Sequence, residues 1–282
     1  MRLHVTDAVT QPAKVVNEDG WVGAGQQLWV LDGASGLTSV PVTDGATDAA
    51  WLVDRARRVI EQRDSDRPAD GLLGTLAAIV DDVESALPAP GSAHAHELPS
   101  ASLVAVALEG DELHALTLGD CRLILRAPGG RAVIIDDASV LDRLDRGAIE
   151  LLATEQRRSG VSLHDARASI ADLLRSNRDL LNGPDGYRAL APGLDVGDVA
   201  QHRIAVAPGT TGLLVSDGFF RLVDTFHVMD AGELLDAVVS EGAEALLGRL
   251  RAIEADDPEG HQYPRLKRSD DATTVAFEVV AS

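Results

Sequence analysis

Cysteine and lysine are nearly absent from this 282-residue chain, which has one cysteine, Cys121, and two lysines, Lys14 and Lys267. A single cysteine excludes a disulfide framework within the chain and favours a reducing compartment. No apolar run approaches the roughly 18 residues that cross a membrane, and the first residues lack the apolar core of a signal peptide. We therefore expect a cytoplasmic protein.

Positive charge is also scarce, because 45 acidic residues face 25 basic ones and the formal net charge is −20. Such a chain is a poor partner for nucleic acid phosphates or anionic lipid, so we expect neither a nucleic acid nor a membrane partner. Hydrophobic residues make up 45% of the chain, which is enough for a sizeable core and excludes a disordered acidic tail.

Hydrophobic patterning predicts strands and helices in alternation. Strands are expected at 2–9, 26–31, 102–108, 112–118, 122–126, 132–135, 203–206, 212–215 and 273–280. Helices are expected at 47–61, 72–87 and 231–253, with a charged helical insert at about 138–200. The four strands between 102 and 135 read as one antiparallel meander. No linker or repeat divides the chain, so residues 1–282 are expected to form one α+β domain of antiparallel sheets covered by helices.

Four acidic positions share one arrangement, because each lies beside a predicted strand. They are Asp32, Asp120, Asp217 and Asp270, and a fifth site, Glu18–Asp19, follows Val15-Val16. Carboxylates that converge at strand ends repel one another and need cations. An all-carboxylate set suits Mg²⁺ or Mn²⁺, and a glycine after an aspartate lets its carbonyl join the ligands. The alternative is that each Asp-Gly pair is only a turn.

Zinc is not indicated by the pattern of ligands. The chain has no cysteine cluster, and its eight histidines show no zinc-type spacing. His94-Ala95-His96 reads as a solvated loop.

Five ordered motifs carry a family likeness. They are Lys14-x-x-Asn17-Glu18-Asp19, Leu31-Asp32-Gly33, Leu118-Gly119-Asp120-Cys121-Arg122, Ser216-Asp217-Gly218-Phe219 and Asp270-Asp271-Ala272-Thr273-x-Val275. Together they resemble the PP2C (PPM) metal-dependent protein phosphatases of the bacterial type, over residues 14 to 275. The resemblance implies an αββα sandwich with two or three Mn²⁺ or Mg²⁺ ions in the cleft between two antiparallel sheets.

The resemblance also implies roles for these residues. Asp32 would bridge two metals, with the carbonyl of Gly33 as a further ligand. The other metal ligands would be Asp217 and Asp270 at the first ion, Asp19 with Glu18 at the second, and Asp120 at a third. Lys14 stands where the family usually has an arginine that grips the substrate phosphate, and a lysine offers a point charge in place of a bidentate fork.

Some positions depart from the family pattern. Ala34 stands where animal members have a histidine and many bacterial members a methionine, so the leaving group has no evident acid there. Asp271 stands where the family often has asparagine, and we do not make it a ligand. Ser35 lacks a nucleophile elbow and a histidine partner, so it reads as a turn residue. Cys121 reads as a small strand residue.

The resemblance implies hydrolysis of phosphoserine or phosphothreonine in a phosphorylated protein by a hydroxide that bridges two metals. Two alternatives stay open. The chain could be a pseudophosphatase that serves as a signalling or binding module, which Lys14 and Ala34 favour. It could also be a phosphatase for small molecules on the same scaffold.

Overall fold

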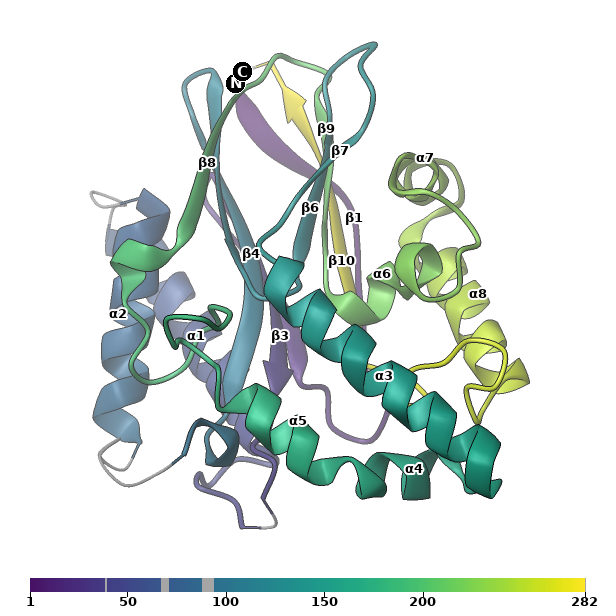
Figure 1. Cartoon of the computed structure of the whole chain (residues 1–282). Helices are drawn as coiled ribbons and strands as arrows, with labels where there is room; N and C mark the ends of the chain where they lie inside the picture. The colour runs from purple at the N-terminus through teal and green to yellow at the C-terminus, as the bar shows by residue number, and fades with distance from the viewer. Residues whose placement is uncertain (39, 67–70, 88–93, 282) are drawn as a thin grey trace.

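The computed structural model describes residues 1–38, 40–66, 71–87 and 94–281. Two five-stranded antiparallel sheets face each other between layers of helices (Figure 1). The strand orders are β2-β3-β4-β5-β8 in the first sheet and β1-β10-β9-β6-β7 in the second. The predicted αββα sandwich is therefore confirmed.

The elements have the following bounds. The first sheet contains β2 (Asp19–Ala24), β3 (Gln27–Ala34), β4 (Ser100–Glu109), β5 (Glu112–Leu118) and β8 (Ala200–Ala205). The second contains β1 (Arg2–Gln11), β6 (Arg122–Arg126), β7 (Val133–Ile135), β9 (Thr211–Val215) and β10 (Ala272–Val280). The helices are α1 (Asp48–Asp66), α2 (Gly71–Ala86), α3 (Ser139–Ser159), α4 (Leu163–Ser169), α5 (Ala171–Arg178), α6 (Asp217–Asp224), α7 (Ala231–Glu241) and α8 (Ala243–Asp256), with short 3₁₀ turns η1 (Ala95–Glu97) and η2 (Val196–Asp198).

The helices form three groups around the sheets (Figure 1). Helices α1 and α2 cover the outer face of the first sheet, and α6, α7 and α8 lie on the outer side of the second. Helices α3, α4 and α5 lie across the end of the sandwich that is opposite the two chain termini. No described helix has the length and apolar character that a membrane span requires.

The central strands are buried on both faces, which explains their continuous apolar runs. In β4, Leu103, Ala105 and Ala107 face the core under α1 and α2, whereas Val104 and Val106 face the core between the sheets. This alternation is the two-residue period of a strand. Both faces of β4 are therefore committed to packing, and only its end is free to carry polar function.

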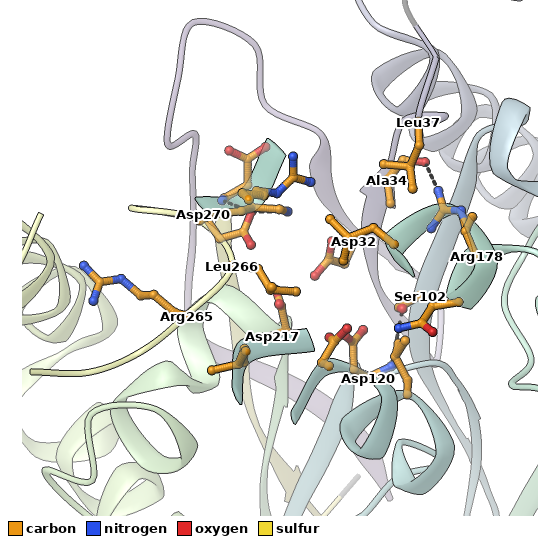
Figure 2. Close-up of a pocket in the computed structure, with 18 of the residues that line it drawn as sticks. Asp32, Ala34, Leu37, Ser102, Asp120, Arg178, Asp217, Arg265, Leu266 and Asp270 are labelled. Carbon is orange, nitrogen blue, oxygen red and sulfur yellow. Dashed lines mark hydrogen bonds and ion pairs between the residues drawn. The ribbon is translucent and has the colours of Figure 1, made fainter. Parts of the chain in front are cut away.

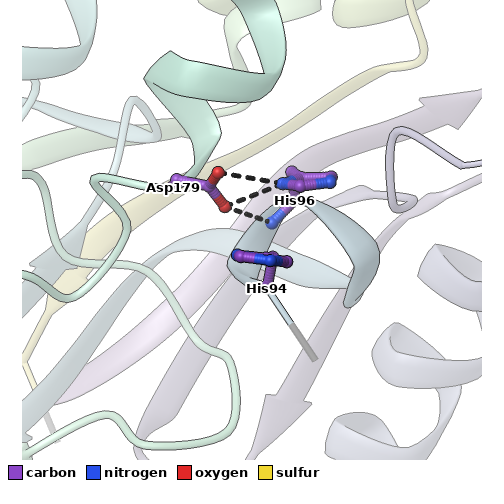
Figure 3. Close-up of side chains that lie close together, drawn as sticks. All are labelled: His94, His96 and Asp179. Carbon is purple, nitrogen blue, oxygen red and sulfur yellow. Dashed lines mark hydrogen bonds and ion pairs between the residues drawn. The ribbon is translucent and has the colours of Figure 1, made fainter. Parts of the chain in front are cut away.

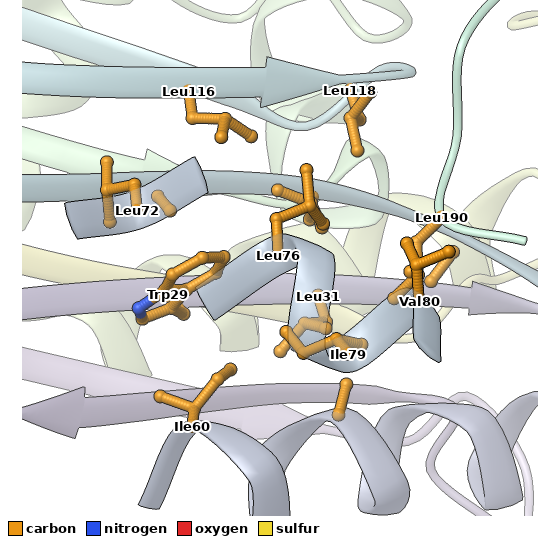
Figure 4. Close-up of a cluster of buried hydrophobic side chains, with 14 of the residues drawn as sticks. Trp29, Leu31, Ile60, Leu72, Leu76, Ile79, Val80, Leu116, Leu118 and Leu190 are labelled. Carbon is orange, nitrogen blue, oxygen red and sulfur yellow. The ribbon is translucent and has the colours of Figure 1, made fainter. Parts of the chain in front are cut away.

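The core between the first sheet and its helices is closely packed (Figure 4). Leu76 and Ile79 of α2 share this core with Trp29 and Leu31 of β3, and all four side chains are fully buried. Burying one such side chain contributes about 1.5–3 kcal/mol. The cluster therefore fixes the position of β3 as far as Leu31, the residue before Asp32.

The predicted meander between 102 and 135 is wrong at its centre. Strands β4 and β5 belong to the first sheet, whereas β6 and β7 belong to the second. The chain crosses between the sheets at residues 119–121. Gly119 has a φ of 69°, and a Cβ there would lie 2.1 Å from Oγ of Ser102, so the crossing needs glycine. Asp120 consequently lies where one sheet gives way to the other.

Three other elements differ from the sequence prediction. Strand β2 begins at Asp19 and was not predicted, because Gly20 and Gly23 weaken the strand signal. Helix α6 was not predicted either, since only a turn was expected after β9. The single helix expected at 231–253 is divided into α7 and α8 by Gly242, whose φ of 90° is incompatible with a continuing helix.

Candidate metal centre

The residues singled out in the sequence gather at one pocket, at the end of the sandwich covered by α3, α4 and α5. Six of them line it, namely Lys14, Glu18, Asp32, Asp120, Asp217 and Asp270. Figure 2 shows the side chains of Asp32, Asp120, Asp217 and Asp270 around the opening. Asp19 and Gly33 are buried beside them. The structure thus brings together every residue of the predicted site.

Strand register brings Asp19 and Asp32 together. They are directly paired in the antiparallel register of β2 and β3, and Asp32 is paired in turn with Ser102 of β4. Opposite residues of an antiparallel pair project to the same face with Cβ atoms about 4.5–5.5 Å apart. Two acids that are 13 positions apart in sequence therefore face one space, with no loop needed to place them.

Asp120 reaches the same region from the crossing between the sheets. Its backbone N–H lies 3.3 Å from Oγ of Ser102 and donates to it. Because Ser102 is the strand partner of Asp32, this hydrogen bond fixes the crossing turn beside Asp32.

The second sheet supplies Asp217 and Asp270. Asp217 opens α6 directly after β9, and Asp270 lies just before β10, the antiparallel neighbour of β9. Ser216 joins the two sheets here, because its hydroxyl donates to Oδ2 of Asp19 at 2.8 Å and accepts the N–H of Thr273 at 3.0 Å. The pocket therefore lies at the junction of the two sheets, which we call the seam.

The pairs Asp32-Gly33 and Asp217-Gly218 are not turn dipeptides. Gly33 lies within β3, where a Cβ would come 2.5 Å from the carbonyl oxygen of Glu18 that accepts the Gly33 N–H. Gly218 lies within α6, where a Cβ would come 1.9 Å from the carbonyl oxygen of Asp271. At each position the backbone of a neighbouring segment leaves no room for a Cβ, so the residue after the aspartate must be glycine.

Burial and mutual repulsion raise the pKa of three of these carboxyl groups. Burial raises the pKa of Asp32, and the charges of Asp19 and Asp217 add to this effect. Burial also raises the pKa of Asp19, and this effect outweighs the hydrogen bond from Ser216, which lowers it. Burial and the charge of Asp270 raise the pKa of Asp217 to about 6.

One oxygen of the site has no hydrogen-bond partner among the described residues. Asp19 is only 6% exposed, and its buried Oδ1 has no hydrogen bond within the described part of the chain. A buried oxygen without a donor, among acids that repel one another, fits a hard divalent cation.

Solved structures of other proteins share this architecture. No protein-family model matches the sequence, and no curated protein matches it significantly. The catalytic domain of the serine/threonine phosphatase PstP with two manganese ions matches at 19% identity over 99% of both chains, with a TM-score of 0.56. PstP/Ppp of Mycobacterium tuberculosis matches at 18% identity over 100% of both chains, with a TM-score of 0.58. The PPM phosphatase MsPP of Mycobacterium smegmatis, in complex with cacodylate, matches at 19% identity over 98% of this chain and 99% of its own, with a TM-score of 0.52.

The chain has the PP2C phosphatase fold. At these identities the likeness establishes the architecture alone.

Asp270 differs from the other candidate ligand acids because two cations already hold it. Nη2 of Arg221 donates to Oδ2 at 2.8 Å, and Nζ of Lys267 donates to Oδ1 at 2.9 Å. Burial opposes their effect, but Lys267 and Arg221 lower the pKa of Asp270. Arg221 is 8% exposed and also pairs with Glu254, whereas the Lys267 side chain is 48% exposed. Asp270 is therefore partly neutralised by the protein itself.

Lys267 and Arg221 were not predicted from the sequence. Both lysines of the chain line this one pocket, and their rarity was the signal that could have pointed to Lys267. Arg221 is one arginine among many and offered no signal.

The acids of the pocket are spread apart. Among the described residues, the group of three His, Cys, Asp or Glu ligand atoms that lie within 4.8 Å of one another is found elsewhere, at His94, His96 and Asp179. Repulsion between the pocket acids and the ion pairs of Asp270 both act to hold them apart.

Asp271 fixes the loop that carries Lys14. Lys14 is exposed between β1 and β2 and lines the pocket. The carboxylate of Asp271 accepts the backbone N–H of Ala13 at 2.7 Å and that of Glu18 at 2.5 Å. These bonds set the path of the loop on both sides of Lys14. Asp271 thus acts on the site through the backbone.

The helical insert adds an acid that the sequence did not single out. Asp145 of α3 lines the pocket. Burial raises its pKa to about 7, and the charges of Asp120 and Asp217 contribute. Nothing in its local sequence separates it from the other acids of a charged helix.

Helix α5 holds the end of β3 and the residue that follows it. Nη2 of Arg178 donates to the carbonyl of Ala34 at 2.7 Å and to that of Ser35 at 3.3 Å (Figure 2). The insert therefore contacts the backbone two residues beyond Asp32.

Neither Ser35 nor Cys121 is arranged as a nucleophile. The Ser35 hydroxyl donates to Oε1 of Glu18 at 2.9 Å and accepts the N–H of Ala49 at 3.2 Å, which ties the segment to α1. Cys121 is fully buried, and burial together with the charge of Asp32 raises the pKa of its thiol. The thiol keeps its proton and fills space in the core between the sheets.

Proposed function

We propose that the chain is a metal-dependent protein phosphatase that hydrolyses phosphoserine and phosphothreonine. The observation that carries the proposal is the convergence of Asp19, Asp32 and Asp217 from two sheets, with a buried oxygen of Asp19 left unpartnered. Solved serine/threonine phosphatases with the same fold support it, one of them in complex with two manganese ions.

Two or three Mn²⁺ or Mg²⁺ ions would be held by the acids of the pocket. The proposed ligands are Glu18, Asp19, Asp32, the carbonyl of Gly33, Asp120, Asp217 and Asp270. When bound, such ions lower the pKa of a water molecule and stabilise charge on a phosphoryl group.

The remaining tasks fall to the chain's own side chains. Lys14 lies exposed at the pocket and would offer one positive charge to a phosphoryl oxygen. Asp271 keeps Lys14 in place through the loop backbone. The net charge of −20 repels phosphopeptides in general, so basic residues beside the phosphorylated serine or threonine would favour binding.

The second candidate is a pseudophosphatase on the same fold. The ion pairs of Asp270 with Arg221 and Lys267 favour it, because they neutralise a proposed ligand without any metal. Ala34, which offers no acid to a leaving group, favours it as well. The unpartnered oxygen of Asp19 speaks against it, since uncompensated buried carboxylates cost stability.

One assay separates these readings. Hydrolysis of an aryl phosphate and of a phosphothreonine peptide is measured with and without Mn²⁺ for the wild type, Asp32→Asn and the control Asp111→Asn. Asp111 is exposed in the β4–β5 hairpin and does not line the pocket. We expect Mn²⁺-dependent turnover that falls by on the order of 100-fold in Asp32→Asn and persists in the control.

Each other outcome has a defined meaning. A wild type that binds Mn²⁺ but turns over neither compound is a pseudophosphatase. Equal turnover by the wild type and Asp32→Asn excludes the proposed site. Hydrolysis of the aryl phosphate without the peptide points to a small-molecule substrate.

A further inference from the structure

We propose that His94, His96 and Asp179 form a separate site for a transition-metal ion of the Zn²⁺ type. One ligand atom from each residue lies within 4.8 Å of the other two (Figure 3). His94 and His96 flank Ala95 at the start of η1, and Asp179 follows the last residue of α5. The site therefore joins two segments that are 83 residues apart.

The three side chains are already organised by short contacts. Nδ1 of His96 lies 2.9 Å from both carboxylate oxygens of Asp179, and the backbone N–H of His96 donates to Oδ1 at 3.1 Å. The rings of His94 and His96 stack with centroids 5.2 Å apart and planes 14° from parallel. Burial raises the pKa of Asp179, but the hydrogen bonds from His96 outweigh burial and lower it.

The spacing suits a tetrahedral ion. Ligand atoms that share Zn²⁺ at about 2.0–2.1 Å lie roughly 3.4 Å apart. The gap of 2.9 Å between His96 and Asp179 is close to that value, so an ion can replace the proton between them. The His94 ring then needs a shift of about 1 Å or slightly more. His94 is exposed, so it has room for this shift.

The ligand types separate this site from the carboxylate pocket. Two imidazoles and one carboxylate suit Zn²⁺, Co²⁺ or Ni²⁺ and leave one position open, whereas an all-oxygen set suits Mg²⁺ or Mn²⁺. The expectation that His94-Ala95-His96 is only a solvated loop did not include Asp179. That residue lies far along the sequence, and only the fold brings it near.

An ion at this site would act on the pocket through its neighbours. Arg178, the residue before Asp179, holds the carbonyls of Ala34 and Ser35. The carbonyl of His96 accepts the N–H of Leu37 at 2.6 Å. Both chain segments that form the site therefore contact residues 34–37, at the end of β3 and just beyond it, and an ion between the two segments would fix the end of α5 there.

Calorimetric titration with Zn²⁺ in excess Mg²⁺ tests the proposal. The Mg²⁺ is added to occupy the all-oxygen carboxylate pocket, so that the Zn²⁺ measured is the Zn²⁺ bound at the histidines. The proteins are the wild type, His96→Ala, Asp179→Asn, Asp32→Asn and the control His164→Ala, whose histidine is exposed on α4. We expect one Zn²⁺ ion per wild-type chain and affinity at least about 10-fold weaker in His96→Ala and Asp179→Asn. Asp32→Asn and His164→Ala should bind as the wild type does.

Co²⁺ provides a second readout that does not depend on activity. Bound by two imidazoles and a carboxylate, it should give the visible absorption of a four- or five-coordinate ion, and this absorption should disappear in His96→Ala while the far-ultraviolet circular dichroism is kept. Zn²⁺ binding that persists in His96→Ala, or that is lost in Asp32→Asn, would overturn the proposal. Neither result changes the interpretation of the Mn²⁺-dependent phosphatase assay, which tests the proposed function independently.

Discussion

Asp270 is a proposed metal ligand whose charge the protein itself offsets. Arg221 is buried and shared with Glu254, so its position is fixed, whereas Lys267 is half exposed and can leave. A divalent ion that approaches Asp270 must therefore compete mainly with the ammonium group of Lys267.

This competition gives a prediction about metal affinity. Lys267→Met should tighten Mn²⁺ binding about two- to fivefold, since an exposed ion pair is worth roughly 0.5–1 kcal/mol. Titration calorimetry with Mn²⁺ measures the change. Lys14→Met is the matched control, because it removes the same charge from the same pocket but breaks no ion pair with Asp270. It should leave Mn²⁺ affinity nearly unchanged and weaken the binding of inorganic phosphate. Weaker Mn²⁺ binding by Lys267→Met would contradict the competition.

Asp145 gives a prediction about pH. Its pKa in the folded protein is about 7, well above the value of about 3.9 in an unfolded chain. The folded state therefore binds the proton more tightly, and its stability falls as the pH rises from about 4 to about 7. In EDTA, Asp145→Asn should be more stable than the wild type by roughly 1–3 kcal/mol at pH 7.5, with little difference at pH 4.

Urea unfolding at the two pH values measures this difference. The exposed acid Asp185 provides the control, and Asp185→Asn should follow the wild type at both. A constant gap between Asp145→Asn and the wild type across the range would mean that Asp145 titrates normally.

The sequence revealed the site residues whose signals are local. Asp32 and Asp217 follow apolar strands and precede glycine, a combination that is visible in a few letters. Arg221 and Asp145 became visible only in three dimensions. They reach the pocket from helix faces, and their sequence neighbours resemble those of any solvated acid or arginine.

At the scale of elements, glycine decides where α7 ends and α8 begins. Gly242 has a φ of 90° and lies between the two helices, whereas Gly248 lies within α8 with open space where a Cβ would stand. Hydrophobic spacing continues through the break, which is why one helix was expected at 231–253.

The two glycines should respond in opposite ways to the same substitution. Gly242→Ala should destabilise the chain by about 1–3 kcal/mol, because alanine is strained at that φ. Gly248→Ala should stabilise it by about 0.5–1 kcal/mol, because alanine loses less backbone entropy in a helix. Urea unfolding compares both with the wild type. Equal effects of the two substitutions would show that the break does not depend on the conformation of Gly242.

Element prediction failed where tertiary contacts override local pattern. β5 and β6 match their predicted bounds of 112–118 and 122–126, yet they belong to different sheets. The turn between them reads as a hairpin turn, and only the strand pairing in the folded chain shows that it is a crossing. Sequence periodicity reports which residues are buried, but not which sheet buries them.

At the scale of the whole molecule, the pocket is a seam that the two sheets share. Asp19 and Asp32 belong to the first sheet, Asp217 and Asp270 adjoin strands β9 and β10 of the second, and the Ser216 hydroxyl donates a hydrogen bond across to Asp19. Without cations, repulsion between these acids works against the contact between the sheets. Bound cations would reverse that effect, so metal binding and folding should be coupled.

This coupling predicts a large thermal response to Mn²⁺. At a free concentration 100-fold above its dissociation constant, one bound ion adds about 2.7 kcal/mol, which corresponds to a Tm rise of roughly 5–10 °C for a chain of this size. Asp32→Asn removes one of the repelling charges. Its Tm in EDTA at pH 7.5 should therefore exceed that of the wild type, while its rise with Mn²⁺ should be much smaller. Calorimetric scans of both proteins in EDTA and in Mn²⁺ measure the four values. An equal Mn²⁺ response in Asp32→Asn would place the ion away from the seam, and a lower Tm of Asp32→Asn in EDTA would show that Asp32 stabilises the empty site.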